Sequence, residues 1–370
     1  MNVSDYLNII ESDVYNGRNP REEYIYFILE NQNKLNRSEF IRFGAIKERI
    51  NAIYAKENNR NARKGESLRD RIRFEGYRTK EKKVNQEEIL VVSDLHGKME
   101  KWEFIRSELL KRPNLRVEIL GDAMDRGPNG IEMLLEIKEW SDKGRVDYLP
   151  GNHDIFTYNY VKSSEFLNRN DVDDSFKGKL NRMFNSARSL LKVNKGNATM
   201  QKLASFDSVV RTQKRNGRIQ NEITLKELMN WLGKQPIQKI IENPEEEKKY
   251  ALAHAIFDTD LYNEKSSFCL EDAFKLEVLG KEDTNLFKKF KNVMWYREGE
   301  PIYTMAPLSL PKDHIMVVGH TNQEKVNRRY IKNERHPIWY VDCGNGNLSG
   351  LNLNSEKVEN IEERALNCGR

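Results

Sequence analysis

Cysteine is scarce in this sequence. Only three occur among 370 residues, and they lie far apart at Cys269, Cys343 and Cys368. A disulfide framework needs paired cysteines, and a cysteine zinc site needs several at short spacing, so the pattern argues against both. We therefore expect a protein of a reducing compartment, namely the cytoplasm.

Long apolar runs are also missing. No segment approaches the roughly 20 apolar residues that a membrane-spanning helix needs. The first residues show no basic segment followed by an apolar one, so we expect no signal peptide and no membrane partner. The net charge is only +5, from 62 basic and 57 acidic residues, which does not by itself indicate nucleic-acid binding.

The first part of the chain, residues 1–86, is predicted to be a helical and basic N-terminal extension. Apolar residues at helical spacing from Ser38 to Ile53 predict a helix, which Ser38 is suited to cap. The stretch 56–83 is basic and is a possible nucleic-acid surface. A solvated helix face and linker is favoured, because acidic residues are interleaved and aromatic residues are few.

From residue 88 onward, apolar segments end repeatedly in polar clusters. Segments resembling helices, Trp102–Leu110 and Gly130–Trp140, lie between the first of them, which is the order of an α/β fold. Ligands bind beyond the carboxyl ends of strands in such folds. The five segments and the clusters at their ends are 89–93 with Asp94-Leu95-His96-Gly97, 117–120 with Gly121-Asp122 to Gly127, 146–149 with Gly151-Asn152-His153-Asp154, 250–253 with His254, and 315–318 with Gly319-His320-Thr321.

Four of the six histidines stand at these strand ends. Histidines of an ordinary core would not sort in this way. Imidazole, carboxylate and amide oxygens together suit two divalent ions, Mn²⁺ first and Fe²⁺ or Zn²⁺ as alternatives. Asp122 would bridge the two ions. The first set of ligands is Asp94, His96 and Asp122, and the second is Asp122, Asn152, His254 and His320.

The motifs in this order resemble the calcineurin-like metallophosphoesterases. They are most similar to the phosphoprotein phosphatase branch, which includes bacterial and phage phosphatases and the symmetrical diadenosine tetraphosphate hydrolases. The resemblance covers 88–155 and 224–355. It rests on Asp-x-His-Gly at 94–97, Gly-Asp-x-x-Asp-Arg-Gly at 121–127, Gly-Asn-His-Asp at 151–154, a Trp-Leu-x-x-x-Pro stretch before His254, Asn-Val-Met-Trp-Tyr-Arg at 292–297, Gly-His-Thr at 319–321, and Val-Asp-Cys-Gly at 341–344.

The resemblance implies an α/β fold, a metallophosphoesterase β-sandwich flanked by helices. We expect the catalytic domain at 87–360, with a polar helical insertion at 156–223 that matches no family motif, and a C-terminal tail at 361–370. The chain departs from the family pattern at several positions. These are Ser93 in place of Gly, Ala255-Ile256 in place of Ala-Gly, Asn322 in place of a second histidine, and Asp154 where eukaryotic members have Glu.

The expected reaction is attack of metal-bound hydroxide on phosphorus. Arg126 is predicted to hold two phosphate oxygens, with Arg297 as a second clamp. His153 is predicted to be the general acid that protonates the leaving group, and Asp125 to orient it. The alternatives to these functional roles are structural: a core position for His254 and an ion pair for Arg297.

Three functions are compatible with the sequence. The first is a phosphomonoesterase acting on phosphoprotein, with phosphoserine, phosphothreonine and phosphotyrosine undistinguished. The second is a nucleotide phosphoesterase, such as a dinucleoside polyphosphate hydrolase or a cyclic-nucleotide phosphodiesterase. The third is a catalytically silent binding module, against which the full set of site residues argues.

Overall fold

The computed structural model describes Ile10 and residues 87–243, 248–281, 284–297, 310, 314–330, 337–343 and 348–363. The chain forms two compact units, Met1–Val84 and Asn85–Arg370. The predicted helix at 38–53, the basic stretch 56–83 and most of the predicted tail, 364–370, lie outside the described residues. Strands β1 to β10 and helices α5 to α14 all belong to the second unit.

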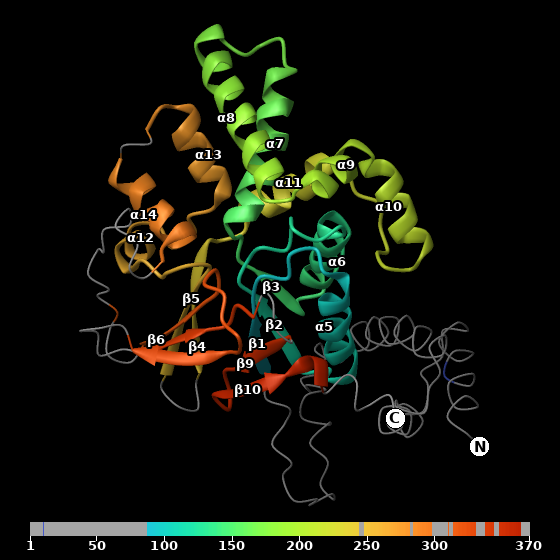
Figure 1. Cartoon of the computed structure of the whole chain (residues 1–370), viewed down its shortest axis with the longest axis vertical. Helices are drawn as coiled ribbons and strands as arrows, with labels where there is room; N and C mark the ends of the chain where they lie inside the picture. Colours follow the sequence, from blue (N-terminus) through green and yellow to red (C-terminus); the bar gives the residue numbers. More distant parts are fainter. Residues whose placement is uncertain are drawn as a thin grey trace, which may run out of the picture. The chain divides into compact units, whose positions relative to one another are not determined.

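Two five-stranded mixed sheets carry the site (Figure 1). The first has the strand order β10-β9-β1-β2-β3, with β1, β2 and β3 parallel. The second has the order β4-β5-β6-β8-β7, with β5, β6 and β8 parallel. The strands are β1 (Glu88–Val92), β2 (Leu115–Ile119), β3 (Val146–Tyr148), β4 (Gln238–Asn243), β5 (Lys248–Ala253), β6 (His314–Val318), β7 (Asn327–Tyr330), β8 (Pro337–Tyr340), β9 (Ser349–Asn352) and β10 (Lys357–Asn360).

The central strands β1 and β6 are largely apolar because both of their faces are buried. On β1, Leu90 and Val92 join the cluster that contains helix side chains, whereas Ile89 and Val91 join the cluster shared by the two sheets. Alternate residues of a strand point to opposite faces, so one strand serves both layers. This is the predicted sandwich, and the five predicted apolar segments are β1, β2, β3, β5 and β6. They divide between two sheets instead of sharing one.

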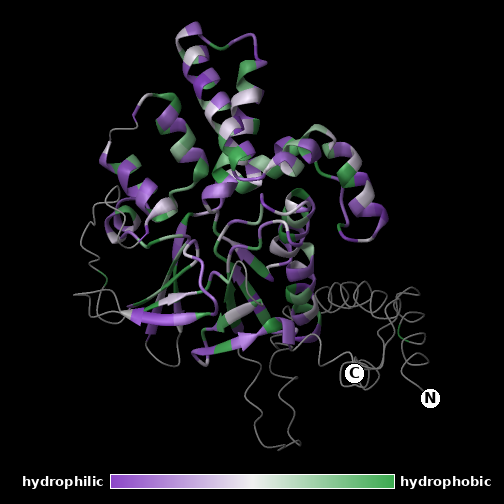
Figure 2. Ribbon diagram, in the orientation of Figure 1, coloured by the Kyte–Doolittle hydropathy of each residue, from purple (hydrophilic) through white to green (hydrophobic). Residues whose placement is uncertain are grey.

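Helices cover the outer faces of the two sheets. Hydrophilic and hydrophobic residues alternate along these helices (Figure 2). The predicted helices near 102–110 and 130–140 are α5 and α6, and 156–223 is largely helical. Within the described residues, no helix is long and apolar enough to cross a membrane. The helices are α5 (Met99–Lys111), α6 (Gly130–Asp142), α7 (Asn152–Leu167), α8 (Asp174–Val193), α9 (Asn197–Ala204), α10 (Phe206–Arg215), α11 (Leu225–Lys234), α12 (Thr259–Glu264), α13 (Leu270–Val278) and α14 (Asn285–Trp295).

An ion cluster joins the two sheets. Lys239 of β4 places its Nζ 2.8 Å from Oε2 of Glu118 on β2 and 2.7 Å from Oδ2 of Asp147 on β3. Glu118 is fully buried. Burial raises the pKa of Glu118 to about 7, although the positive charge of Lys239 acts in the opposite direction. The cluster therefore holds a carboxylate that depends on its cation.

We expect Lys239→Met to lower the free energy of unfolding by at most about 3–5 kcal/mol above neutral pH, because it removes the nearer cation of a buried charge and leaves Arg116, whose Nε lies 3.5 Å from Oε1 of Glu118. A raised folded-state pKa means that the neutral carboxyl favours the folded protein, so its contribution is present at acid pH and lost as the pH rises through about 7. The loss of unfolding free energy in Lys239→Met should therefore be smaller at acid pH. Urea unfolding on both sides of this pKa measures it.

The matched control is Lys138→Met, which removes a cation whose Nζ lies 2.7 Å from Oδ2 of the exposed Asp142. An exposed ion pair of this kind contributes less than about 1 kcal/mol, so the control should change little at either pH. An equal loss from Lys239→Met at both pH values would contradict the expected role of Glu118.

Candidate active site

The predicted site residues lie together where strands of both sheets end. Six of them have positive φ angles, and they account for six of the eight non-glycine residues with this conformation among those described. Such backbone costs about 1–3 kcal/mol per residue and persists mainly at functional sites. The six, with their φ angles, are Asp94 (56°), His96 (48°), Asp122 (56°), Asp125 (64°), Arg126 (59°) and His320 (59°).

The first group of ligand atoms surrounds His96. Its Nδ1 lies 3.2 Å from the carbonyl oxygen of Met124, which only accepts, so Nδ1 carries the proton and Nε2 keeps its lone pair. Nε2 is buried and has no hydrogen-bond partner among the residues that the structure describes. It lies 3.6 Å from Oδ1 of Asp94 and 3.8 Å from Oδ2 of Asp122. A buried nitrogen of this kind, facing two carboxylates, fits a divalent cation.

The second group surrounds His254, which is fully buried. Its Nδ1 lies 2.7 Å from the carbonyl oxygen of Leu120, which only accepts, so in the neutral ring the lone pair is on Nε2. This Nε2 lies 3.0 Å from Oδ1 of Asn152, 3.2 Å from Nδ1 of His320 and 3.6 Å from Oδ1 of Asp122. Burial and the neighbouring His254 lower the pKa of His320 to about 3, so its ring is neutral, as metal ligation requires.

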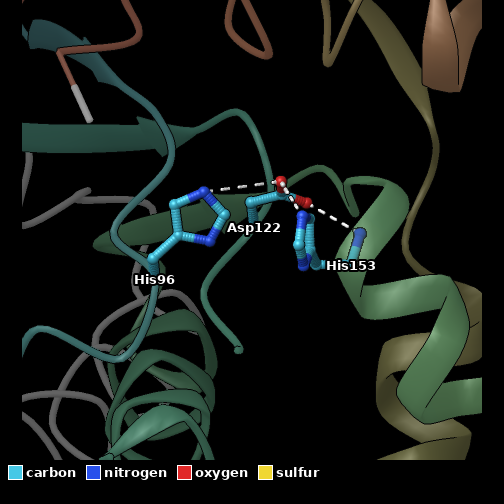
Figure 3. Close-up of side chains that lie close together, drawn as sticks. All are labelled: His96, Asp122 and His153. Carbon is cyan, nitrogen blue, oxygen red and sulfur yellow. Dashed lines mark hydrogen bonds and ion pairs between the residues drawn. The ribbon is translucent and has the colours of Figure 1, made fainter. Parts of the chain in front are cut away.

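Asp122 belongs to both groups. Its Oδ2 faces His96 and its Oδ1 faces His254. Burial acts to raise the pKa of Asp122, but the charges of His254 and His153 outweigh it and lower that pKa. Figure 3 shows the Asp122 carboxylate between the rings of His96 and His153. The carboxylate is therefore ionised and placed to bridge two cations.

The candidate general acid, His153, also lies close to the first group. Atoms of His96, Asp122 and His153 lie within 4.8 Å of one another, as do those of Asp94, Asp122 and His254, so geometry alone permits His153 as a ligand. However, its Nε2 lies 3.3 Å from a guanidinium nitrogen of Arg126. A positive charge at that atom disfavours a metal ion there.

The other nitrogen of His153 faces a carboxylate. Nδ1 lies 3.1 Å from Oδ2 of Asp125, which is fully buried. Burial acts to lower the pKa of His153, but the charge of Asp122 and the hydrogen bond to Asp125 outweigh it and raise that pKa. The imidazole therefore holds its proton more tightly than a free histidine does. The contact with Asp125 gives the orientation that a general acid needs, whereas the guanidinium of Arg126, which only donates, must move away from Nε2 before that atom can donate a proton.

Both predicted arginines are exposed, but they contact different histidines. Arg126 lies beside His153, whereas Nε of Arg297 donates to Nε2 of His320 at 3.1 Å. The structure thus brings Arg297 to the second group of ligands. Its predicted role as a phosphate clamp stays a prediction.

Asp154 had no predicted role, yet it fixes the site backbone. It is fully buried, and its Oδ2 accepts from the hydroxyl of Tyr148 at 2.5 Å, from N of Gly151 at 2.8 Å and from N of Asp122 at 3.0 Å. Burial raises its pKa to about 6. Its position three residues after Gly151 was a usable signal, because an acidic residue there caps a helix.

Gly151 is required because of close approach. A Cβ on it would collide with Oδ1 of Asp122, so no larger residue fits between α7 and the bridging carboxylate.

Thr199, from the insertion, is a second residue without a predicted role. Its hydroxyl donates to Oδ1 of Asp125 at 2.9 Å.

Part of this chain is similar to a known bacterial phosphatase. Over 83 residues, 20% of this chain and 33% of the relative, the chain is 28% identical to the asymmetrical bis(5'-nucleosyl)-tetraphosphatase PrpE of Bacillus velezensis. It therefore spans about a third of that relative's length.

Two solved structures are also similar. The cold-active protein-tyrosine phosphatase of a psychrophilic Shewanella species is 16% identical, with a TM-score of 0.37 over 74% of this chain and 76% of that one. A metallophosphoesterase from Sphaerobacter thermophilus is 11% identical, with a TM-score of 0.31 over 73% and 85%.

A family model decides the assignment. The model described as calcineurin-like phosphoesterase matches residues 88–337, which is more than half of the chain. This range contains both groups of ligand atoms and the His153–Asp125 pair. The chain therefore belongs to the calcineurin-like phosphoesterase family.

Proposed function

We propose that this protein is a dimetal phosphomonoesterase that acts on phosphoproteins. The observation that carries the proposal is the contact between His153 and Asp125, 3.1 Å apart, directly beside the bridging Asp122. Asp94, His96 and Asp122 would hold one ion, and Asp122, Asn152, His254 and His320 the other. When bound, two divalent ions supply an activated water and neutralise phosphate charge.

The protein's own groups supply binding and a proton. Arg126 is exposed and lies beside His153, where its planar guanidinium can hold two phosphate oxygens. Asp125 fixes the imidazole through Nδ1, which leaves Nε2 to face the leaving group. His153 gives its proton from Nε2 to the departing oxygen as the phosphorus–oxygen bond breaks.

The nature of the leaving group favours monoesters over anhydrides. An alkoxide from phosphoserine or phosphothreonine is strongly basic and needs a proton to leave, whereas a nucleoside phosphate leaves readily as an anion. A buried imidazole whose pKa is raised by two carboxylates suits the first case.

A nucleotide phosphoesterase is the second candidate. It is favoured by the match to the nucleosyl-tetraphosphatase PrpE, which covers 20% of this chain. We propose Mn²⁺ as the metal, because mixed imidazole, carboxylate and amide ligands suit it, although Fe²⁺ and Zn²⁺ share that preference. We also propose a cytoplasmic location from the scarcity of cysteine, and a phosphoprotein partner ahead of nucleic acid.

Phosphate release by the purified full chain tests the proposal. We expect Mn²⁺-dependent hydrolysis of p-nitrophenyl phosphate and of a phosphoserine or phosphotyrosine peptide, abolished by chelation. Diadenosine tetraphosphate and 2′,3′-cyclic nucleotides should be hydrolysed more slowly. A higher kcat/KM on either nucleotide would replace the proposal by the second candidate. Metal binding without hydrolysis of any of these substrates would support a binding module.

A further inference from the structure

The insertion at 156–223 reaches the residues around His153, the candidate general acid. Thr199 on α9 is 1% exposed and Asp125 is fully buried, so their hydrogen bond is shielded from water. The two residues are 74 positions apart. The hydroxyl donates to Oδ1 of Asp125, while Oδ2 of the same carboxylate faces Nδ1 of His153. One carboxylate therefore links the insertion to the imidazole.

The turn before α9 also packs against this carboxylate. A Cβ placed on Gly196 would lie 2.7 Å from Oδ1 of Asp125 and 2.8 Å from the carbonyl oxygen of Leu191. Both are too close for an unshifted side chain. Gly196 thus allows the backbone of the insertion to approach Asp125, and Thr199 makes the polar contact three residues later.

The helix that carries Thr199 is itself held in place. Lys202 on α9 forms an ion pair with the buried Glu132 on α6. Leu203 on α9 is buried in the main hydrophobic cluster. In Figure 1, α9 lies near one end of α6. The hydroxyl is therefore presented from a fixed element.

We propose that Thr199 is a positioning residue for proton transfer to the leaving group, and that the insertion thereby contributes to the active site. This inference rests on the proposed role of His153. A carboxylate held at Oδ1 cannot rotate away from the imidazole, so Oδ2 keeps Nδ1–H of His153 in place and Nε2 aimed at the substrate. Without the hydroxyl, no hydrogen bond from the described part of the chain remains at Oδ1, and the ring loses its fixed orientation.

The test compares substrates that differ in leaving group. Thr199→Val keeps the shape but removes the O–H, and Thr199→Ser keeps the O–H. We expect Thr199→Val to lower kcat about tenfold on phenyl phosphate, as removal of an orienting partner typically does, with less effect on p-nitrophenyl phosphate and no change in KM. Thr199→Ser should restore the rate. Thr212→Val is the matched control, because its exposed hydroxyl only bonds to the carbonyl of Ser208 in α10.

A second variant keeps the inference testable if Thr199→Val does not fold. Gly196→Ala pushes a methyl group toward Oδ1 of Asp125 and should show the same selective loss. An equal loss on both substrates, or a rise in KM alone, would overturn the inference. His153→Ala is the reference. If it also loses both substrates equally, the general-acid role fails together with the positioning. If only the Thr199 and Gly196 variants lose activity equally on both substrates, the positioning role of Thr199 fails and the general-acid role of His153 stands.

Discussion

Replacement of His153 by alanine is expected to lower kcat on phenyl phosphate by about 10²- to 10⁴-fold, the usual contribution of a general acid. The loss on p-nitrophenyl phosphate should be much smaller, because nitrophenolate leaves without a proton. The structural basis is the position of the ring, with Nδ1 on Asp125 and Nε2 beside Arg126. Steady-state kinetics on both substrates at saturating Mn²⁺ measure the difference.

The pH dependence gives the same experiment a second readout. The pKa of His153 is raised, so the acid form persists to higher pH than in a free histidine and is lost as the pH rises through that pKa. The kcat on phenyl phosphate should therefore fall on the alkaline side in the native protein, and His153→Ala should lack this fall. If the variant instead loses Mn²⁺ binding and both activities together, His153 is a ligand, as its place near His96 and Asp122 permits.

The sequence predicted the parts of the fold and site that have a local signal. Asp94, Asp122 and His254 were identifiable because each comes after a strand that is buried on both faces and therefore apolar. Strands β7 and β10 at the sheet edges lacked such a signal. Their sequences, Asn-Arg-Arg-Tyr and Lys-Val-Glu-Asn, contain few apolar residues because edge strands have less surface to bury.

The contact of the insertion with Asp125 had no local signal in the sequence. Thr199 is a single threonine in a polar helix, and its partner lies 74 residues earlier. A hydrogen bond between such distant residues depends on how α9 packs against α6, which hydrophobic periodicity does not specify. Asp154 is a different case. It stood within a recognised motif, and its three donors come from the turn around it, from Tyr148 and from Asp122.

Asp122→Asn is expected to reduce activity by about 10³-fold or more, equivalent to about 4 kcal/mol, because it removes the charge shared by both ligand groups. An amide offers one oxygen where the carboxylate offers two. Oδ2 faces His96 and Oδ1 faces His254, so one of the two groups loses a ligand atom. Mn²⁺ bound per chain, measured after equilibrium dialysis, should therefore fall.

The matched control is Asp258→Asn, the same substitution at another buried carboxylate. Asp258 is 8% exposed and caps α12 by accepting from N of Leu261, a role that asparagine also fills. It should keep its Mn²⁺ content and activity. Mn²⁺ should also raise the melting temperature of the native protein and of the control, because ligands that bind only the folded state stabilise it. If Asp122→Asn binds as much Mn²⁺ as the native protein and Mn²⁺ raises its melting temperature equally, this carboxylate does not bridge the ions. The loss of activity would then need another cause.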